Sequence, residues 1–384
     1  MIYLDNSATT PLCEKAIERI NVAIETFGNP SSLHNVGFEA ERLKESARES
    51  IMKALGVRKF SGDKLIFTSG GTEANNLAVF GSVYSKPSNK GKKIITTDSE
   101  HPSVLTPFQN LEKEGYKVVY LSTKKGKIDL DEVKSVIDSD TVFISIMSVN
   151  NETGAVYDVK EIFSLAKRIN PKITTHTDCV QGFLKIPFSP SATKADLVSI
   201  SSHKIHGPKG VGALYVSADT VKTKRLVPLQ IGGGQEEGFR SGTENMLGIC
   251  GFGGACEYEH AHFEENTKRM RELRNYLTEN LKDIVTVNEP ETPAPHVVNI
   301  TLPDIRSETM LHYLSKQDIY VSSGSACSSN HAKTASHVLL GFGLDTHLAE
   351  SSIRISLSED NTKEEIDLFI KALKKGIEEL VHSR

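Results

Sequence analysis

The sequence predicts an α/β fold in which helices cover a mostly parallel β-sheet. Between residues 60 and 216, short runs rich in β-forming residues alternate with segments of helical periodicity. The chain has 384 residues, of which 38% are hydrophobic, and a single hydrophobic core stops growing near roughly 250–300 residues. We therefore expect one large α/β domain and one smaller domain.

Seven segments have the character of strands, which predicts a seven-stranded sheet in the large domain. They are Lys64–Phe67, Lys93–Thr97, Lys117–Leu121, Thr141–Met147, Ile173–Thr177, Asp196–Ile200 and Gly212–Val216. Helices are expected between them at Glu73–Val83, Ser103–Glu114, Asp129–Ile137 and Val159–Ile169. Thr, Pro, Asp or Gly stands at the ends of these helices, where capping favours them.

The remaining segments predict a smaller α+β domain. Amphipathic helices are expected at Glu14–Glu25 and Glu39–Leu55, and a long helical pattern runs from Leu247 to about Leu281. It is followed by strands at Val297–Leu302 and Ile319–Val321, with helices at 308–316 and 362–380. We place the large domain at residues 14–255 and the smaller one at 1–13 and 256–384. The pattern alone also allows the first two helices to join the smaller domain.

Composition excludes several classes of protein. The 45 Lys and Arg residues against 49 Asp and Glu leave a net charge of −4, so no basic excess predicts a nucleic-acid or membrane partner. Apolar stretches such as Val142–Ile146 are far shorter than the roughly 20 residues that span a bilayer, and no secretory signal is visible. We expect a soluble, cytoplasmic protein.

The five cysteines, at positions 13, 179, 250, 256 and 327, predict at least one working thiol. Their odd number and spacing fit neither a disulfide framework nor a zinc module, and no metal site is expected. Cys250 and Cys256 stand at helical positions and are expected to fill the core.

Two residues suggest carbonyl chemistry. Lys204 follows a strand and precedes a Gly-Pro turn, and a lysine fixed in this way is a candidate for forming a Schiff base. Asp178 ends the preceding strand, at the sheet edge where α/β proteins bind ligands, and a buried Asp can keep a pyridine nitrogen protonated. Taken singly, each has a plainer interpretation, a surface lysine and a helix cap.

Three further loops reach the same edge of the sheet. The segment Thr68–Asn75 joins a strand to a helix, and the N–H groups of Gly71 and Thr72 are expected to bind an anion there. It matches neither of the two common nucleotide-binding motifs, and a plain turn is the alternative. His101 follows the next strand, 93–97, and Asn150 follows the strand at 141–147. His101 is a candidate for stacking on a ring and moving protons.

Together these residues resemble the class V, fold-type I enzymes that use pyridoxal 5′-phosphate (PLP), and more narrowly the group I cysteine desulfurases of the NifS/IscS type. The resemblance covers nearly the whole chain, through motifs at 3–10, 28–34, 68–73, 201–210, 232–236 and 240–245. It implies the fold of a fold-type I PLP-dependent transferase. It also implies a homodimer whose active sites are shared between the subunits.

The resemblance assigns roles to most of the candidate residues. It implies that Lys204 binds PLP covalently, that Asp178 and Gln181 contact the pyridine nitrogen and phenolic oxygen, and that His101 stacks on the ring. The phosphate is assigned to Gly71, Thr72, Ser201 and His203, with Thr243 contributed by the partner subunit. Asn150 is assigned to cofactor and substrate, and Arg354 to the substrate carboxylate.

Cys327 distinguishes this resemblance from its neighbours. It lies in the Gly- and Ser-rich segment 321–329, which predicts an exposed loop, and an unreactive loop cysteine is the alternative. The resemblance implies that its thiolate takes sulfur from L-cysteine as a persulfide and leaves L-alanine. The sulfur is then expected to pass to an acceptor scaffold protein, for iron–sulfur cluster or other thio-cofactor assembly.

Two other kinds of enzyme and one kind of protein without catalytic activity would also fit part of this set of candidate residues. A class V aminotransferase or a selenocysteine lyase would share Lys204 and Asp178 but would not need Cys327 as a sulfur carrier. A sulfur-scaffold subunit without activity would need none of the three. Cys179 is expected to fill a small space, no role is assigned to Gln235, and the sequence leaves the sulfur acceptor open.

Overall fold

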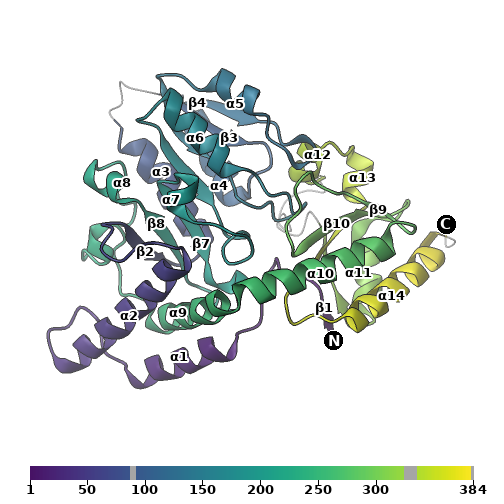
Figure 1. Cartoon of the computed structure of the whole chain (residues 1–384), viewed down its shortest axis with the longest axis horizontal. Coiled ribbons are helices and arrows are strands. Elements are labelled where there is room, and N and C mark those ends of the chain that lie inside the picture. Colours follow the sequence, from purple (N-terminus) through teal and green to yellow (C-terminus); the bar gives the residue numbers. More distant parts are fainter. Residues whose placement is uncertain (87–91, 324–334, 382–384) are drawn as a thin grey trace.

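The computed structural model describes residues 1–86, 92–323 and 335–381, and Figure 1 shows their arrangement. The predicted seven-stranded sheet is confirmed. Its strands are β2 (Lys64–Thr68), β3 (Lys93–Thr97), β4 (Lys117–Leu121), β5 (Thr141–Ser145), β6 (Thr174–Asp178), β7 (Leu197–Ser201) and β8 (Gly212–Val216). They lie in the order β2-β8-β7-β6-β5-β3-β4. Only β8 runs antiparallel to its neighbours, so the sheet is mostly parallel.

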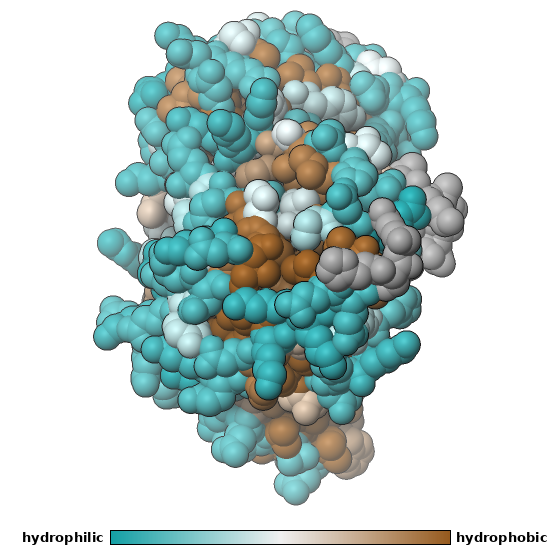
Figure 2. Space-filling view, turned by 90° about the vertical axis from the view of Figure 1, so that its right-hand side faces the viewer, coloured by the Kyte–Doolittle hydropathy of each residue, from teal (hydrophilic) through white to brown (hydrophobic). Residues whose placement is uncertain are grey.

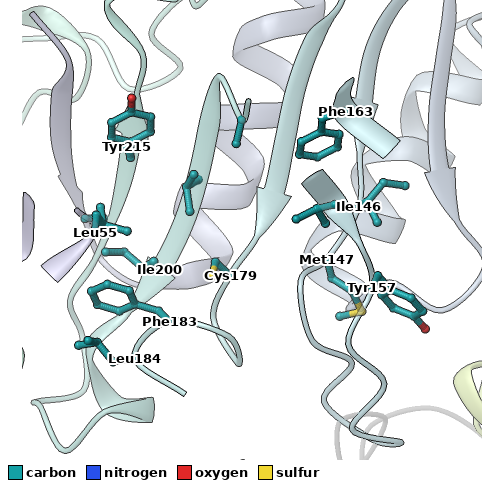
Figure 3. Packing of buried hydrophobic residues seen from close by; sticks show 14 of the residues in the cluster. Leu55, Ile146, Met147, Tyr157, Phe163, Cys179, Phe183, Leu184, Ile200 and Tyr215 are labelled. Atoms are coloured by element: carbon teal, nitrogen blue, oxygen red, sulfur yellow. The ribbon is translucent and has the colours of Figure 1, made fainter. Parts of the chain in front are cut away.

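Helices cover both faces of this sheet because its strands alternate buried side chains between the two faces. Phe143 in β5 packs in a cluster with α3 (Gly71–Tyr84) and α4 (Pro102–Lys113), whereas the next residue, Ile144, packs on the other side. That second cluster includes Phe163 of α6 (Val159–Ile169) and Val133 of α5 (Leu130–Val136), and part of it is drawn in Figure 3. Short helices α7 (Pro190–Thr193) and α8 (Ala218–Lys222) complete this region.

The two N-terminal helices pack with the large sheet. Helices α1 (Glu14–Glu25) and α2 (Asn35–Ala54) lie against α9 (Met246–Ala261). Ala16, Ile51 and Leu55 belong to the same buried cluster as Phe163. The alternative that these helices join the smaller domain is therefore not supported, while the boundaries at residues 13 and 255 stay a prediction.

A smaller α+β region contains both ends of the chain, as expected. Its antiparallel sheet has the order β12 (Ser322–Ser323), β13 (Ser352–Ser356), β10 (Val297–Thr301) and β9 (Thr286–Val287), and β1 (Ile2–Tyr3) pairs with β11 (Ile319–Tyr320). The helices are α10 (Phe263–Leu281), α11 (Ser307–Ser315), α12 (His337–Phe342), α13 (Thr346–Glu350) and α14 (Lys363–Val381). Leu4, Leu277, Met310 and Phe369 share its core.

The single long helix expected from Leu247 to Leu281 is wrong. The chain leaves helical geometry at His262, with φ −109° and ψ 11°, and continues as α10. No glycine or proline stands at residues 255–281 to mark this break, so the pattern alone does not reveal it. The break lets α9 pack beside α1 and α2 while α10 runs across to the smaller region, as Figure 1 shows.

The face formed by the C-terminal elements is mostly hydrophilic, with hydrophobic residues gathered toward its middle (Figure 2). Across residues 1–86, 92–323 and 335–381, no helix combines the length and the apolar character that crossing a bilayer requires.

Candidate active site

A cavity of about 360 Å³ lies where the large sheet meets the smaller region. Residues from the ends of several strands of the large sheet line one side, and residues of β12 and β13 line the other. Of the residues predicted for the site, it contains Gly71, Thr72, His101, Asp178, Gln181, Ser201, His203, Lys204 and Arg354. Cavities of this size and mixed polarity are typical of small-molecule sites.

Lys204 ends a 3-10 turn, Ser202–Lys204, that follows β7 directly. Its Nζ donates hydrogen bonds to the carbonyl oxygens of Ser7 at 2.6 Å and Ala8 at 2.7 Å. Gln181 Nε2 donates to the same Ser7 oxygen at 2.9 Å. The N-terminal segment thus fixes the direction of the lysine amine and joins it to a second predicted site residue.

Asp178 is the last residue of β6 and is only 5% exposed. Its Oδ2 accepts a hydrogen bond from Asn75 Nδ2 at 2.7 Å, and its Oδ1 accepts one from the Val180 N–H at 2.9 Å. The two donors fix the plane of the carboxyl group. The sequence pattern did not assign Asn75 to the site, because an Asn on the first turn of a helix carries no signal of its own.

The start of α3 is suited to an anion. Gly71 and Thr72 begin this helix of 14 residues, where unpaired N–H groups concentrate, and Ser201 and His203 line the same cavity. A Cβ on Gly71 would lie 2.8 Å from Val180 Cγ2, so any larger residue would have to displace Val180. Burial, with the nearby Lys204, lowers the pKa of His203 to about 4, which makes it a neutral hydrogen-bonding partner at pH 7.

His101 caps the N-terminus of α4. Its Nδ1 lies 2.8 Å from Ser103 Oγ and accepts a hydrogen bond from the Ser103 N–H at 3.1 Å. Burial lowers the pKa of His101, and the ammonium of Lys204 acts in the same direction against Asp178. The ring is therefore neutral near pH 7 and is held in one orientation at the cavity wall.

Arg354 reaches the cavity from β13 of the smaller region. Its Nη2 donates to Asp5 Oδ1 at 2.7 Å and its Nη1 to the carbonyl oxygen of Asn151 at 2.8 Å. Its buried Nε has no hydrogen-bond partner among the described residues. A fixed guanidinium with an unused donor in a cavity is suited to a carboxylate ligand.

Asn150 does not line the cavity, and its contact with ligands stays a prediction. Asn150 is fully buried, and its amide bonds inside the turn, accepting from the N–H groups of Glu152 and Thr153, each at 2.9 Å. The next residue, Asn151, lines the cavity instead, and its Oδ1 has no hydrogen-bond partner within the described chain. Two identical neighbours cannot be told apart from the sequence, because the conformation of the turn decides which one faces the cavity.

Thr243 and Cys327 are not part of the described cavity. Thr243 is exposed and absent from the lining, and Gln235, to which no role was assigned, braces its loop by accepting a hydrogen bond from the Gly242 N–H at 2.8 Å. Cys327 lies outside the described residues. Before it, Ser323 lines the cavity, and after it, Ser336 Oγ donates to Glu152 Oε2 at 2.6 Å.

Glu152 is a further cavity residue that the sequence analysis missed. Burial raises its pKa to about 7, against the effects of Ser336 and Arg354. The other cysteines behave as expected from their positions: Cys179, Cys250 and Cys256 are buried. Burial raises the pKa of Cys179 to about 12 and that of Cys250 to about 11, so neither is a thiolate near neutral pH.

The sequence and the fold match those of known proteins. The aminotransferase class-V family matches residues 2–369. The chain belongs to this family. Cysteine desulfurase IscS of Dictyoglomus turgidum is 40% identical over 385 residues, which cover 99% of this chain and 95% of that protein. The chain is therefore a member of the NifS/IscS group.

Solved structures agree with this membership. A NifS-like protein superposes with a TM-score of 0.89 at 37% identity, covering 97% of this chain and 98% of that one. SspA in complex with cysteine has a TM-score of 0.80 at 32% identity, covering 94% of this chain and 100% of that one. The family resemblance expected from the sequence and the fold type I architecture are confirmed.

The protein is a PLP enzyme, as this family membership establishes. Its cavity fits the cofactor on physical grounds. It offers a fixed amine at Lys204, a buried carboxylate at Asp178 and a helix N-terminus where Gly71 leaves room for a phosphate.

Proposed function

We propose that this protein is a PLP-dependent cysteine desulfurase, which converts L-cysteine to L-alanine and accepts the sulfur on Cys327 as a persulfide. One observation carries the proposal: Lys204, Asp178 and Arg354 line one cavity. Of the described residues on either side of Cys327, Ser323 lines the same cavity and Ser336 bonds to the cavity residue Glu152. A relative named cysteine desulfurase IscS and a structure of SspA in complex with cysteine support the choice of substrate.

Different residues of the cavity would hold different parts of the cofactor. Lys204 would bind it covalently, Asp178 would pair with the pyridine nitrogen, and Gln181 would contact the phenolic oxygen. The phosphate would lie at Gly71, Thr72, Ser201 and His203, and His101 would cover the ring. When bound, PLP withdraws electrons from the substrate's Cα, which makes the proton on that carbon removable.

The chain's own residues then bind L-cysteine and move its protons. Arg354 would hold the substrate carboxylate with its guanidinium, and Asn151, which also lines the cavity, would contact the ligands. Lys204 Nζ removes the Cα proton, since a fixed and partly desolvated amine is an effective base. His101, neutral at pH 7, can accept a proton from a thiol and return it to the product.

Sulfur transfer requires Cys327 to reach the substrate. Ser323, which lines the cavity, precedes Cys327 by four residues in the sequence. Its thiolate forms an S–S bond to the substrate sulfur as the Cβ–Sγ bond breaks. The electron pair of that bond stays with the three-carbon fragment, which gains protons and leaves as L-alanine.

The active form is a homodimer in which Thr243 completes the phosphate site of the partner subunit. Thr243 is exposed and does not line the cavity of its own chain. Phe27, Leu33 and Ile231 are 84%, 90% and 81% exposed, as expected for side chains that a second subunit covers. The persulfide would pass to an acceptor protein for iron–sulfur cluster or other thio-cofactor assembly, and a cytoplasmic location stays a prediction.

The deciding experiment compares wild-type protein with Cys327→Ala. We expect wild type to release alanine and, with a reducing thiol, sulfide in equal amounts, and to carry a persulfide on residue 327 by mass spectrometry. Cys327→Ala should keep the visible band of bound PLP but lose both products. Formation of the sulfur-containing keto acid of cysteine in place of alanine would exclude the desulfurase and favour an aminotransferase. Equal turnover by the variant would exclude Cys327 as the sulfur acceptor.

A further inference from the structure

A second cluster of chemically active side chains lies apart from the cavity. His206, in the turn after Lys204, meets Glu259 of α9 and Glu359, which lies between β13 and α14. One ligand atom from each, an imidazole nitrogen and two carboxylate oxygens, lies within 4.8 Å of the others. All three are buried, with exposed fractions of 3%, 0% and 8%.

The imidazole of His206 directs a lone pair at the two carboxylates. Its Nδ1 lies 3.1 Å from the carbonyl oxygen of Pro11, and a carbonyl only accepts, so Nδ1 carries the hydrogen. With its hydrogen on Nδ1, the imidazole presents the lone pair of Nε2 on its other side. This Nε2 lies 3.3 Å from Glu359 Oε1 and has no hydrogen-bond partner in the described part of the chain.

The carboxylates also have unused oxygens. Glu259 Oε2 accepts from Asn266 Nδ2 at 3.2 Å, but its Oε1 has no hydrogen-bond partner among the described residues. Glu359 Oε2 has none either, and Lys185 Nζ lies 3.9 Å from it. The two carboxyl groups are close enough to interact directly, although like charges repel strongly in a buried site.

A shared proton would relieve only part of this conflict. One proton bridges two acceptor atoms and leaves the third without a partner, and a buried acceptor without a partner is costly. A metal ion accepts electron pairs from all three atoms at once. A histidine whose Nδ1 donates to a carbonyl and whose Nε2 faces anionic ligands is also the usual arrangement at metal centres.

We propose that His206, Glu259 and Glu359 bind one divalent transition-metal ion of the Zn²⁺ type. An imidazole nitrogen with two carboxylate oxygens suits zinc better than magnesium or calcium, which prefer sites made of oxygen alone. Zinc bonds of about 2.0–2.2 Å place neighbouring ligands of a tetrahedron roughly 3.4 Å apart. The 3.3 Å between His206 Nε2 and Glu359 Oε1 matches such an edge.

The ion would have a structural role next to the active site. Its three ligands come from the turn that carries Lys204, from the helix that supports the large sheet, and from the C-terminal region. It would therefore join the two parts of the molecule through a residue, His206, that follows the cofactor lysine by two positions. The ion and the two carboxylates would together be neutral, and Lys185 Nζ lies outside the ligand set, 3.9 Å from Glu359 Oε2.

Zinc content of the PLP-loaded protein tests this. After exposure to Zn²⁺ and gel filtration, mass spectrometry of the metal should find about one zinc per chain in wild type. Glu259→Gln should hold less than about a tenth of this. The control Glu257→Gln lies on the same helix but pairs with Arg19, outside the cluster, and should keep its zinc. Cys327→Ser should keep it too, which separates this site from binding at a reactive thiol.

A second measurement needs no variant. Wild type stripped with a chelator should unfold several degrees higher once Zn²⁺ is restored, because an ion that binds only the folded state stabilises it. Wild type without zinc above background and without a shift would overturn the proposal and leave a shared proton as the explanation. Zinc retained by Glu259→Gln, or lost from Cys327→Ser, would overturn it as well.

Discussion

Asn75 Nδ2 donates a hydrogen bond of 2.7 Å to Asp178 Oδ2 across 103 positions of the sequence. The bond joins the first turn of α3, where the phosphate is expected, to the end of β6, where the pyridine nitrogen is expected. It therefore fixes the distance between the two positions in the protein that would hold the ends of the cofactor. Asn75 is a positioning residue, because it acts on the cofactor through Asp178.

Replacing Asn75 with Ala should weaken PLP binding about 10- to 100-fold. A hydrogen bond to a charged group contributes about 1.5–3 kcal/mol, and the variant leaves Asp178 with one donor fewer. Titration of the PLP-free protein with PLP, followed by its visible absorption, measures the change. Asn76→Ala is the matched control, since Asn76 Nδ2 bonds the carbonyl oxygen of Thr72 in its own helix at 2.8 Å. Equal losses in both variants would assign the effect to the helix instead.

Asn150 and Asn151 should respond to alanine in opposite ways. Asn150→Ala removes an amide that holds its turn through several buried hydrogen bonds, so it should lower the melting temperature by several degrees. Asn151→Ala removes an amide that faces the cavity, so it should lower kcat/KM about 10-fold with little change in melting temperature. Thermal unfolding and cysteine turnover measure the two effects. The reverse pattern would support Asn150 as the ligand-binding residue.

The asparagine pair shows where sequence reasoning stops. Strands such as Lys93–Thr97 were placed correctly because a β-rich run between turn residues is a local signal. Lys204 and Asp178 were found because each follows a strand, and parallel strands deliver their ends to one edge. Tertiary contacts decide which side chain of the turn faces the cavity, that β8 runs antiparallel and that the helix breaks at His262. The local sequence pattern does not encode these contacts.

The contacts between distant segments were beyond prediction for the same reason. Asp5 holds Arg354 and Ser7 accepts from Lys204, yet neither N-terminal residue has a feature that marks it as part of a site. The sequence analysis missed the cluster at His206 because each member lies more than fifty residues from the next one along the chain. Only the folded chain brings a loop histidine and two glutamates together.

Glu100 should make stability depend on pH. It is fully buried, and burial raises its pKa to about 8 although Met147 N–H and Thr97 Oγ1 donate to its Oε1. The unfolded carboxyl titrates near its ordinary value of about 4.3, so between about pH 4.3 and 8 the folded state binds the extra proton. The protonated Glu100 therefore contributes its full stabilisation of the folded state below about pH 4.3, and this contribution is lost as the pH rises from about 4.3 to 8.

Glu100→Gln tests this, because the amide keeps an acceptor for the Met147 N–H but cannot ionise. Melting temperature measured from pH 5 to pH 8 should fall less steeply in Glu100→Gln than in wild type. The exposed Glu112→Gln is the control and should follow wild type. Parallel curves for wild type and Glu100→Gln would mean that Glu100 ionises normally in the folded protein.

Thr243 should act in the partner's active site, and mixed dimers measure this directly. Lys204→Ala should abolish turnover, and Thr243→Ala should reduce it about 10-fold by weakening the phosphate site. In a mixed dimer, the Thr243→Ala chain keeps its lysine and receives an intact threonine from the Lys204→Ala chain, so one of its two sites is complete. Random reassociation of equal amounts should thus restore about a quarter of wild-type activity, given the two-fold symmetry of such dimers. If Thr243 serves its own chain, every lysine-bearing site in the mixed dimers lacks it, and activity stays near half that of Thr243→Ala alone.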